Sequence, residues 1–135
     1  ARQVNDHKPK WVVDKVKLMV AEFLSENKNK TITDVTVSCF GLAFKPNIDD
    51  LRESPALNIT KELATLNFRK LLIVEPNIVA LPDSLKNDGE LVSIKTALAT
   101  SDIIVLLVSH LDFMDVDLDR SLSKRIVDTT GLWSK

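Results

Sequence analysis

The chain has 135 residues, a length that suits a single domain with one hydrophobic core. Its 18 basic and 19 acidic residues leave a formal net charge of −1, so no global field favours nucleic acid or a membrane surface as a partner. The single cysteine, Cys39, excludes an internal disulfide, and His7 and His110 stand alone without the spacing of a metal site. Any binding site must therefore be local.

No stretch approaches the roughly 18 consecutive apolar residues of a membrane-spanning helix, and no basic-then-apolar leader opens the chain. We therefore expect a cytoplasmic protein. The sequence begins with Ala1 instead of a methionine, within a polar segment that is compatible with a helix. From this start we expect a piece of a longer protein.

The first predicted element is an amphipathic helix that begins near Pro9. Its apolar residues recur at helical spacing: Val12, Val16, Met19, Val20 and Phe23. Such a stripe is the ordinary sign of a helix packed on a sheet, rather than of a cofactor-binding face. The polar residues 25–30 then predict a loop, and the apolar, β-branched run 35–40 predicts the first strand.

The first strand leads into a loop and a second helix, whose apolar residues again recur at helical spacing: Ala56, Ile59, Leu63 and Leu66. Ser54 is placed to cap this helix, and Pro55 occupies its first turn. The free N–H groups of a helix start attract anions, and Lys45 and Arg52 add two positive charges to the loop. The loop is therefore a candidate anion site. Its basic residues could equally pair with acidic neighbours: Asp49, Asp50 and Glu53.

Residues 70–75 form a continuous apolar run that ends in Glu75, which predicts a strand covered on both faces, as in a parallel sheet. An acid at the end of such a strand often binds a ribose, but the loop after the first strand lacks the GxGxxG fingerprint of an NAD site. A solvent-exposed acid at the strand end explains Glu75 at least as well. Residues 76–89 predict a loop with at most a short helical turn.

The remaining elements continue the alternation of strands and helices. Residues 91–94 predict a short strand, 95–100 a short helix, and 102–108, the most apolar segment, the central strand. A short helix within 111–122 and a last strand at 125–128 follow. This alternation predicts a three-layer α/β/α sandwich with a Rossmann-like, mainly parallel sheet.

Neither Cys39 nor His110 is predicted to carry out chemistry. Cys39 lies within a hydrophobic strand, where a small buried side chain is expected, whereas a reactive thiol needs an exposed and electropositive setting. His110 follows a strand without a Ser or Cys partner in a motif, so a surface histidine is expected.

Residues 41–56, which read GLAFKPNIDDLRESPA, resemble the signature of the UDP-glucose/GDP-mannose dehydrogenase family, where the sheet of its C-terminal domain begins. Residues 1–9 resemble the end of the family's long central helix, residues 74–77 the end of its second strand, and residues 126–133 its terminal segment. The resemblance covers nearly the whole chain. Within the family, the sequence is most similar to the UDP-N-acetyl-D-mannosamine dehydrogenase subgroup.

The resemblance implies an enzyme of three parts: an N-terminal NAD-binding domain, a central helical domain with the catalytic cysteine, and this C-terminal domain. Residues 1–10 would be the end of the central helix or a linker, and residues 11–135 the UDP-sugar-binding domain. The implied reaction oxidises the sugar C6 hydroxyl to a carboxylate with two NAD molecules, through a thiohemiacetal and a thioester. In the subgroup it converts UDP-N-acetylmannosamine to the uronic acid for surface polysaccharide precursors.

By position, Phe44 and Lys45 match family residues that contact the UDP-sugar, and Arg52 matches one that reaches NAD in the opposite domain. The catalytic cysteine belongs to a motif that this chain lacks, so Cys39 does not inherit its role, and the chain alone is expected to be inactive. The implied partners are the UDP-sugar, NAD and the protein's own two other domains. The full-length chain would form a homodimer, without nucleic acid or membrane.

The resemblance departs from the family pattern at Thr130. Many members carry a basic residue there that touches the ligand, whereas a threonine supplies one hydrogen bond but no charge. Two other functions remain open from the residues alone: a stand-alone nucleotide-binding or regulatory module, and an assembly domain that presents its first helix to a partner.

Overall fold

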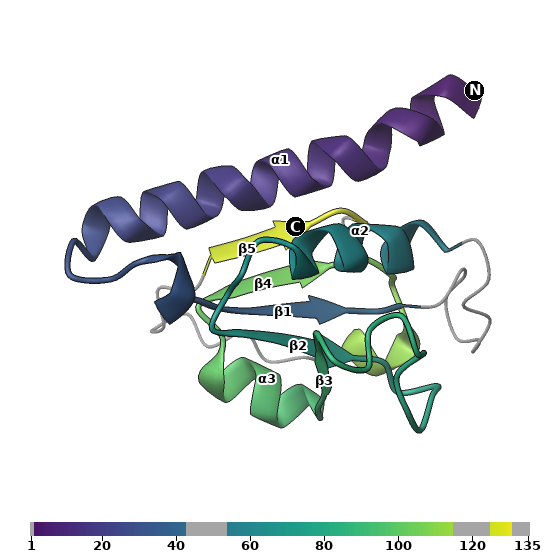
Figure 1. Ribbon diagram of the computed structural model, residues 1–135. Coiled ribbons are helices and arrows are strands. Elements are labelled where there is room, and N and C mark those ends of the chain that lie inside the picture. Colours follow the sequence, from purple (N-terminus) through teal and green to yellow (C-terminus); the bar gives the residue numbers. More distant parts are fainter. Residues whose placement is uncertain (1, 43–53, 115–124, 131–135) are drawn as a thin grey trace.

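The computed structural model describes residues 2–42, 54–114 and 125–130, with side chains from Lys10 onward (Figure 1). Within these residues five strands form one parallel sheet: β1 (Thr36–Phe40), β2 (Lys70–Val74), β3 (Glu90–Leu91), β4 (Ile103–Leu106) and β5 (Arg125–Asp128). The helices are α1 (Arg2–Glu26), α2 (Pro55–Ala64) and α3 (Ile94–Thr100), with 3₁₀ turns η1 (Ile32–Asp34) and η2 (Leu111–Phe113).

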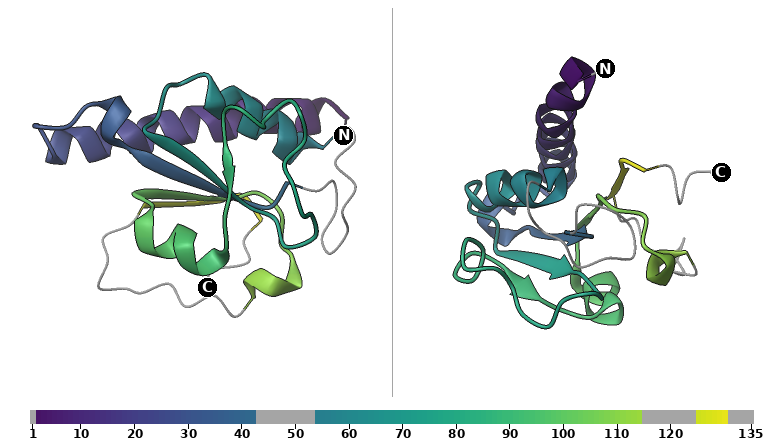
Figure 2. Two further views of the ribbon diagram at one scale, coloured as in Figure 1. Left: turned by 60° about the horizontal axis from the view of Figure 1, so that its bottom comes forward. Right: turned by 90° about the vertical axis from the view of Figure 1, so that its right-hand side faces the viewer.

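The helices cover both faces of the sheet, which confirms the predicted three-layer sandwich. Helices α1 and α2 lie side by side on one face and α3 lies on the other (Figures 1 and 2). Every strand pairing among the described residues is parallel, so all carboxyl ends point to the same edge. None of the helices in the described ranges is long and apolar enough to span a membrane.

The core residues of α1 are those of the predicted stripe. Val12, Val16 and Val20 are buried against the sheet, and Met19 and Phe23 pack at its margin. The apolar stripe of α2 packs on the same face of the sheet, and residues 71–74 of β2 are all buried because helices cover the sheet on both sides. Side chains of α1 and α2 therefore pack together on one face of the sheet.

The strand order corrects one expectation. The order β3-β2-β1-β4-β5 places β1 in the middle, whereas residues 102–108 were expected to supply the central strand. Strand β4 lies between β1 and β5 and is fully buried. The high hydrophobicity of β4 reflects burial on both faces of the sheet, and β1, its interior neighbour, is buried in the same way. Hydrophobicity therefore does not determine which of the two strands is central.

Helix α1 begins at Arg2 and continues through Pro9, whereas its start was expected near Pro9. The other element bounds are nearer to those expected. Strand β5 covers the predicted residues 125–128, and residues 76–89 form turns as expected. The predicted strand 91–94 is shorter, because Ser93 caps α3 and the helix begins at Ile94. Within 111–122 the structure describes η2, and the rest of that segment lies outside the described residues.

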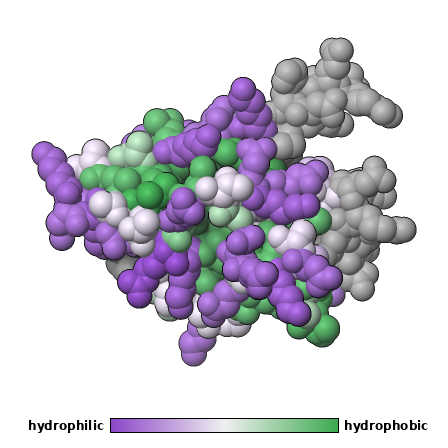
Figure 3. All heavy atoms as spheres, viewed as in Figure 1, coloured by the Kyte–Doolittle hydropathy of each residue, from purple (hydrophilic) through white to green (hydrophobic). Residues whose placement is uncertain are grey.

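The surface view shows mostly hydrophilic residues, with hydrophobic ones over the C-terminal half of α1 (Figure 3). Trp11 and Leu18, seven positions apart on α1, are about half exposed, at 54% and 52%. Residues seven apart lie on one face of a helix. Helix α1 therefore carries apolar side chains on its outer side as well as on its packed side.

We predict that Gly41→Ala destabilises the fold by about 1–3 kcal/mol. Gly41 has a φ of 101°, and an added Cβ would lie 2.6 Å from Val108 Cβ and 2.9 Å from its backbone nitrogen. Gly89→Ala is the matched control, because a Cβ there meets the movable end of Ile73. Urea denaturation should show the larger loss for Gly41→Ala, and equal losses would contradict a backbone constraint at Gly41.

Candidate functional site

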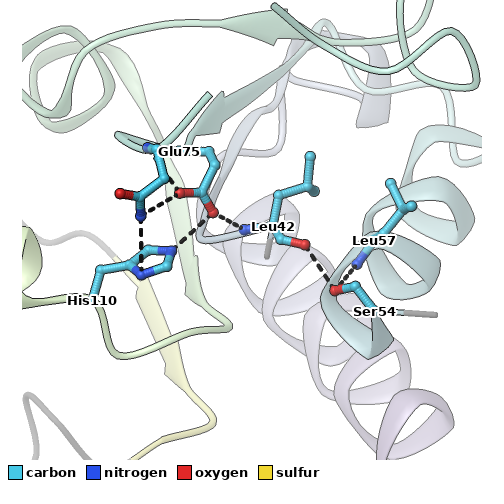
Figure 4. Close-up of polar contacts among 6 residues, drawn as sticks. Leu42, Ser54, Leu57, Glu75 and His110 are labelled. Atoms are coloured by element: carbon cyan, nitrogen blue, oxygen red, sulfur yellow. Dashed lines mark hydrogen bonds and ion pairs between the residues drawn. The ribbon is translucent and has the colours of Figure 1, made fainter. Parts of the chain in front are cut away.

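Three strand ends bring polar groups together at the carboxyl edge of the sheet. Leu42 follows β1, Glu75 follows β2 and His110 follows β4, and Figure 4 shows them converging. The chain runs from β1 outward to β2 and later returns to the other side of β1 for β4, so this edge contains the point where the strand order reverses. Parallel α/β sheets bind their ligands at such a point.

The carboxylate of Glu75 is the centre of a buried hydrogen-bond network. Its Oε1 accepts hydrogen bonds from the Leu42 backbone N–H at 2.7 Å and from His110 Nε2 at 2.9 Å. Its Oε2 accepts from the backbone N–H and the side-chain amide of Asn77, both at 3.1 Å. Glu75 and His110 are 3% and 0% exposed. A buried carboxylate is tolerated only when it is paired in this way.

The network also specifies the state of the His110 ring. The Asn77 amide nitrogen donates to Glu75 and lies 3.4 Å from His110 Nδ1, so Nδ1 is the acceptor of this contact. Nε2 then carries the proton that is donated to Glu75. A proton on Nε2 therefore fits both the contact of His110 with Glu75 and its contact with Asn77.

The pKa of Glu75 results from opposing effects. Burial raises it, while hydrogen bonds from His110, Leu42 and Asn77 favour the charged carboxylate, and together they hold the pKa below its ordinary value. The Glu75 side chain is thus ionised at neutral pH despite its burial. It supplies a fixed negative charge at the carboxyl end of β1, where it binds the Leu42 N–H.

Ser54 joins the start of α2 to the end of β1. Its hydroxyl donates to the Leu42 carbonyl at 2.7 Å and accepts from the Leu57 backbone N–H at 3.2 Å, which confirms the predicted cap (Figure 4). Ser54 itself is buried. The N-terminus of α2 is consequently fixed at the same sheet edge as Glu75.

The predicted ligand residues Phe44, Lys45 and Arg52 lie outside the described residues. The structure describes Leu42 and Ser54, the residues on either side of that segment, and the Ser54 hydroxyl donates a hydrogen bond to the Leu42 carbonyl. The roles expected for the three residues stay predictions.

Two expectations about this edge are wrong. Glu75 is not a solvent-exposed acid, and His110 is not a surface histidine, because each side chain satisfies the other inside the protein. Local sequence does not show this pairing, since the residues are 35 positions apart. The available signal was that both follow apolar runs, so a parallel sheet places them at one edge.

The expectation for Cys39 is confirmed. Its side chain is fully buried in β1, and this burial raises the pKa of the thiol to about 12, with a smaller opposing effect from Thr60. A neutral buried thiol is a poor nucleophile. Cys39 is therefore a core residue.

At the end of β5, the exposed Thr130 donates from its backbone N–H and its hydroxyl to Asp128 at 3.0 and 3.1 Å. The described part of the chain contains no cluster of metal-ligating side chains. An open pocket of ≈ 400 Å³ lies between the ends of β2 and β3 and the start of α3. Its charged lining residues are Glu75, Lys95 and Asp112.

A parallel sheet in this order, with a capped helix at its carboxyl edge, defines a Rossmann-like α/β domain. Residues 38–135 match the profile of the UDP-glucose/GDP-mannose dehydrogenase family, UDP binding domain. The chain belongs to this family.

Similar proteins agree with this assignment. The chain is 47% identical to the UDP-N-acetyl-D-mannosamine dehydrogenase of Escherichia coli K12 over 133 residues, which cover 98% of the chain but 31% of that protein. The UDP-N-acetyl-mannosamine dehydrogenase structure from Staphylococcus aureus is 25% identical with a TM-score of 0.68, covering 97% of the chain and 29% of that protein. GDP-mannose dehydrogenase from Pseudomonas aeruginosa shares the fold, with a TM-score of 0.73 at 23% identity over 99% of the chain and 30% of that protein.

We predict that Ser54→Ala lowers the free energy of unfolding by about 2–3 kcal/mol, because it removes a cap and leaves the buried Leu42 carbonyl without this donor. Ser93→Ala is the matched control: Ser93 caps α3 from an exposed position and should cost about 1 kcal/mol. Chemical denaturation of both variants measures the difference, and an equal cost would mean that the Leu42 bond adds no stability.

Acid should weaken the fold through Glu75. Since its folded pKa lies below the ordinary value of 4.5, its stabilising contribution is present above about pH 4.5 and is lost as the pH falls through the folded pKa. Glu75→Gln should therefore flatten the dependence of unfolding free energy on pH below 4.5. Glu62→Gln on the exposed side of α2 should leave it unchanged. Parallel slopes for Glu75→Gln and the parent chain would refute this assignment.

Proposed function

We propose that this chain binds the nucleotide of a UDP-sugar for an NAD-dependent nucleotide-sugar 6-dehydrogenase. The observation that carries the proposal is the match of residues 38–135 to the family's UDP-binding domain, a range that includes the connection between β1 and α2. The fixed N-terminus of α2 supports the same site, because a helix start at the carboxyl edge of a parallel sheet suits a phosphate group.

Three residues of the loop would make the contacts. Phe44 and Lys45 would bind the UDP-sugar, with the lysine as a point charge on phosphate or ribose oxygens. Arg52 would reach NAD held by another domain, where its planar guanidinium suits a pyrophosphate. Glu75 binds the backbone N–H of Leu42 and so anchors the residue that precedes this loop.

NAD itself would be held mainly outside this chain. The connection from β1 to α2 spans residues 41–54 and lacks the short glycine-rich turn that cradles a dinucleotide in this fold. The residues therefore do not fit a complete NAD site, and the chain alone would not turn over substrate. The E. coli relative supports UDP-N-acetylmannosamine as the sugar nucleotide that the whole protein would oxidise to the uronic acid with two NAD per turnover.

The chain spans about a third of its relatives' length, so the whole protein would contain further domains. Trp11 and Leu18 on the outer side of α1 support a packing contact with such a domain or with a second copy in a homodimer. The whole protein would be located in the cytosol and would contribute to the synthesis of surface polysaccharide precursors.

We predict that Lys45→Ala weakens UDP binding by this chain by about 1–3 kcal/mol, because a charged hydrogen bond to the ligand is lost. Lys61→Ala removes the same charge from the exposed side of α2 and should leave the affinity unchanged. Isothermal titration calorimetry with UDP measures both. Equal affinities for the parent and Lys45→Ala chains would reject Lys45 as a ligand residue, and equal losses in both variants would indicate a non-specific charge effect.

A further inference from the structure

The buried network at the sheet edge bears directly on the segment that would bind the nucleotide. Leu42 and Ser54, twelve positions apart, bracket residues 43–53 and are joined by the Ser54 hydroxyl and the Leu42 carbonyl at 2.7 Å. The other polar group of the Leu42 main chain, its N–H, is bound by Glu75 at 2.7 Å. Glu75 thus holds Leu42 directly, and Ser54 is linked to Glu75 only through Leu42.

We propose that Glu75 and His110 are positioning residues for nucleotide binding, which hold Leu42 and, through it, Ser54 in the geometry that the binding loop requires. This inference rests on the proposed function. Neither residue need touch the ligand: Glu75 acts through the Leu42 backbone, and His110 acts through Glu75.

The choice of a carboxylate supports a positioning role. The Leu42 N–H needs one acceptor, yet Glu75 accepts at least four hydrogen bonds, from Leu42, His110 and two groups of Asn77. A buried charge costs free energy that a neutral core avoids, so it is a poor device for stability alone. Such a network is rigid when all its members are satisfied, and it fixes one position for the Leu42 amide.

His110 fixes the carboxylate from the opposite side. Its ring donates to Glu75 Oε1 and lies edge-on to Phe113 of η2 at 5.4 Å between ring centroids. Phe113 in turn packs on Phe40, the last residue of β1, at 5.2 Å. The contacts therefore run from β1 through the two rings to Glu75 and back to Leu42. A side chain that occupies the space of His110 but cannot donate would leave the carboxylate without this support.

The test compares four variants of this chain with the parent. Glu75→Gln replaces one carboxylate oxygen with an NH₂ group, which donates where Glu75 accepts. His110→Leu removes the hydrogen-bond donor to Glu75. His110→Gln keeps a donor on a side chain of similar length. Val105→Ala opens a cavity in the fully buried part of β4, away from the network, and controls for lost stability. The readouts are UDP affinity by calorimetry and the hydrogen-exchange rates of the Leu42 and Leu57 amides by NMR.

Positioning predicts that Glu75→Gln and His110→Leu weaken UDP binding about tenfold and accelerate exchange at the Leu42 amide. The UDP affinity of His110→Gln should stay within about threefold of that of the parent. Val105→Ala should leave the UDP affinity unchanged, and its amide exchange should change only as much as its loss of global stability explains. An unchanged affinity in Glu75→Gln, or a loss equal to that of Val105→Ala at equal stability, would overturn the inference.

The two readouts separate this inference from the proposed function. If the parent chain binds no UDP, the proposed nucleotide site fails, whereas the Leu42 exchange rate still decides whether Glu75 holds the loop end. Faster exchange confined to Leu42 and Leu57 in Glu75→Gln supports the positioning role in that case. Exchange equal to that of the parent rejects it.

Discussion

The structure depends on the way in which the main chain of Leu42 is held. Its N–H is bound by Glu75 and its carbonyl by Ser54, so side chains from two other elements fix the chain as it leaves β1. Main-chain polar groups in a buried turn must find partners, and here they find them in a strand end and a helix cap. The sheet edge and the start of α2 are thereby joined at one residue.

The parallel sheet makes this arrangement possible. Because β1, β2 and β4 all point their carboxyl ends to one edge, residues 33 and 35 positions apart meet there without any long loop reaching across. The same edge presents the N-terminus of α2, with its positive dipole end. A nucleotide site at this edge is consistent with both features.

Much of the fold could be predicted from the sequence because its signals are local. The stripe of Val12, Val16 and Val20, the cap at Ser54 and the apolar strand before Glu75 each reflect neighbours within a few residues. The pairing of Glu75 with His110 could not be predicted, since the burial of each depends on the other across 35 positions. Hydrophobicity alone likewise did not distinguish β1 from β4 as the middle strand.

The nucleotide site can be tested by amide NMR of the isotope-labelled chain during titration with UDP, with CMP and inorganic phosphate as controls. A nucleotide site at the start of α2 predicts shift changes concentrated between Gly41 and Leu57 and at residues 75–77, larger for UDP than for either control. Unchanged spectra at millimolar UDP, or changes confined to the amino-terminal edge of the sheet, would contradict a nucleotide site at the start of α2.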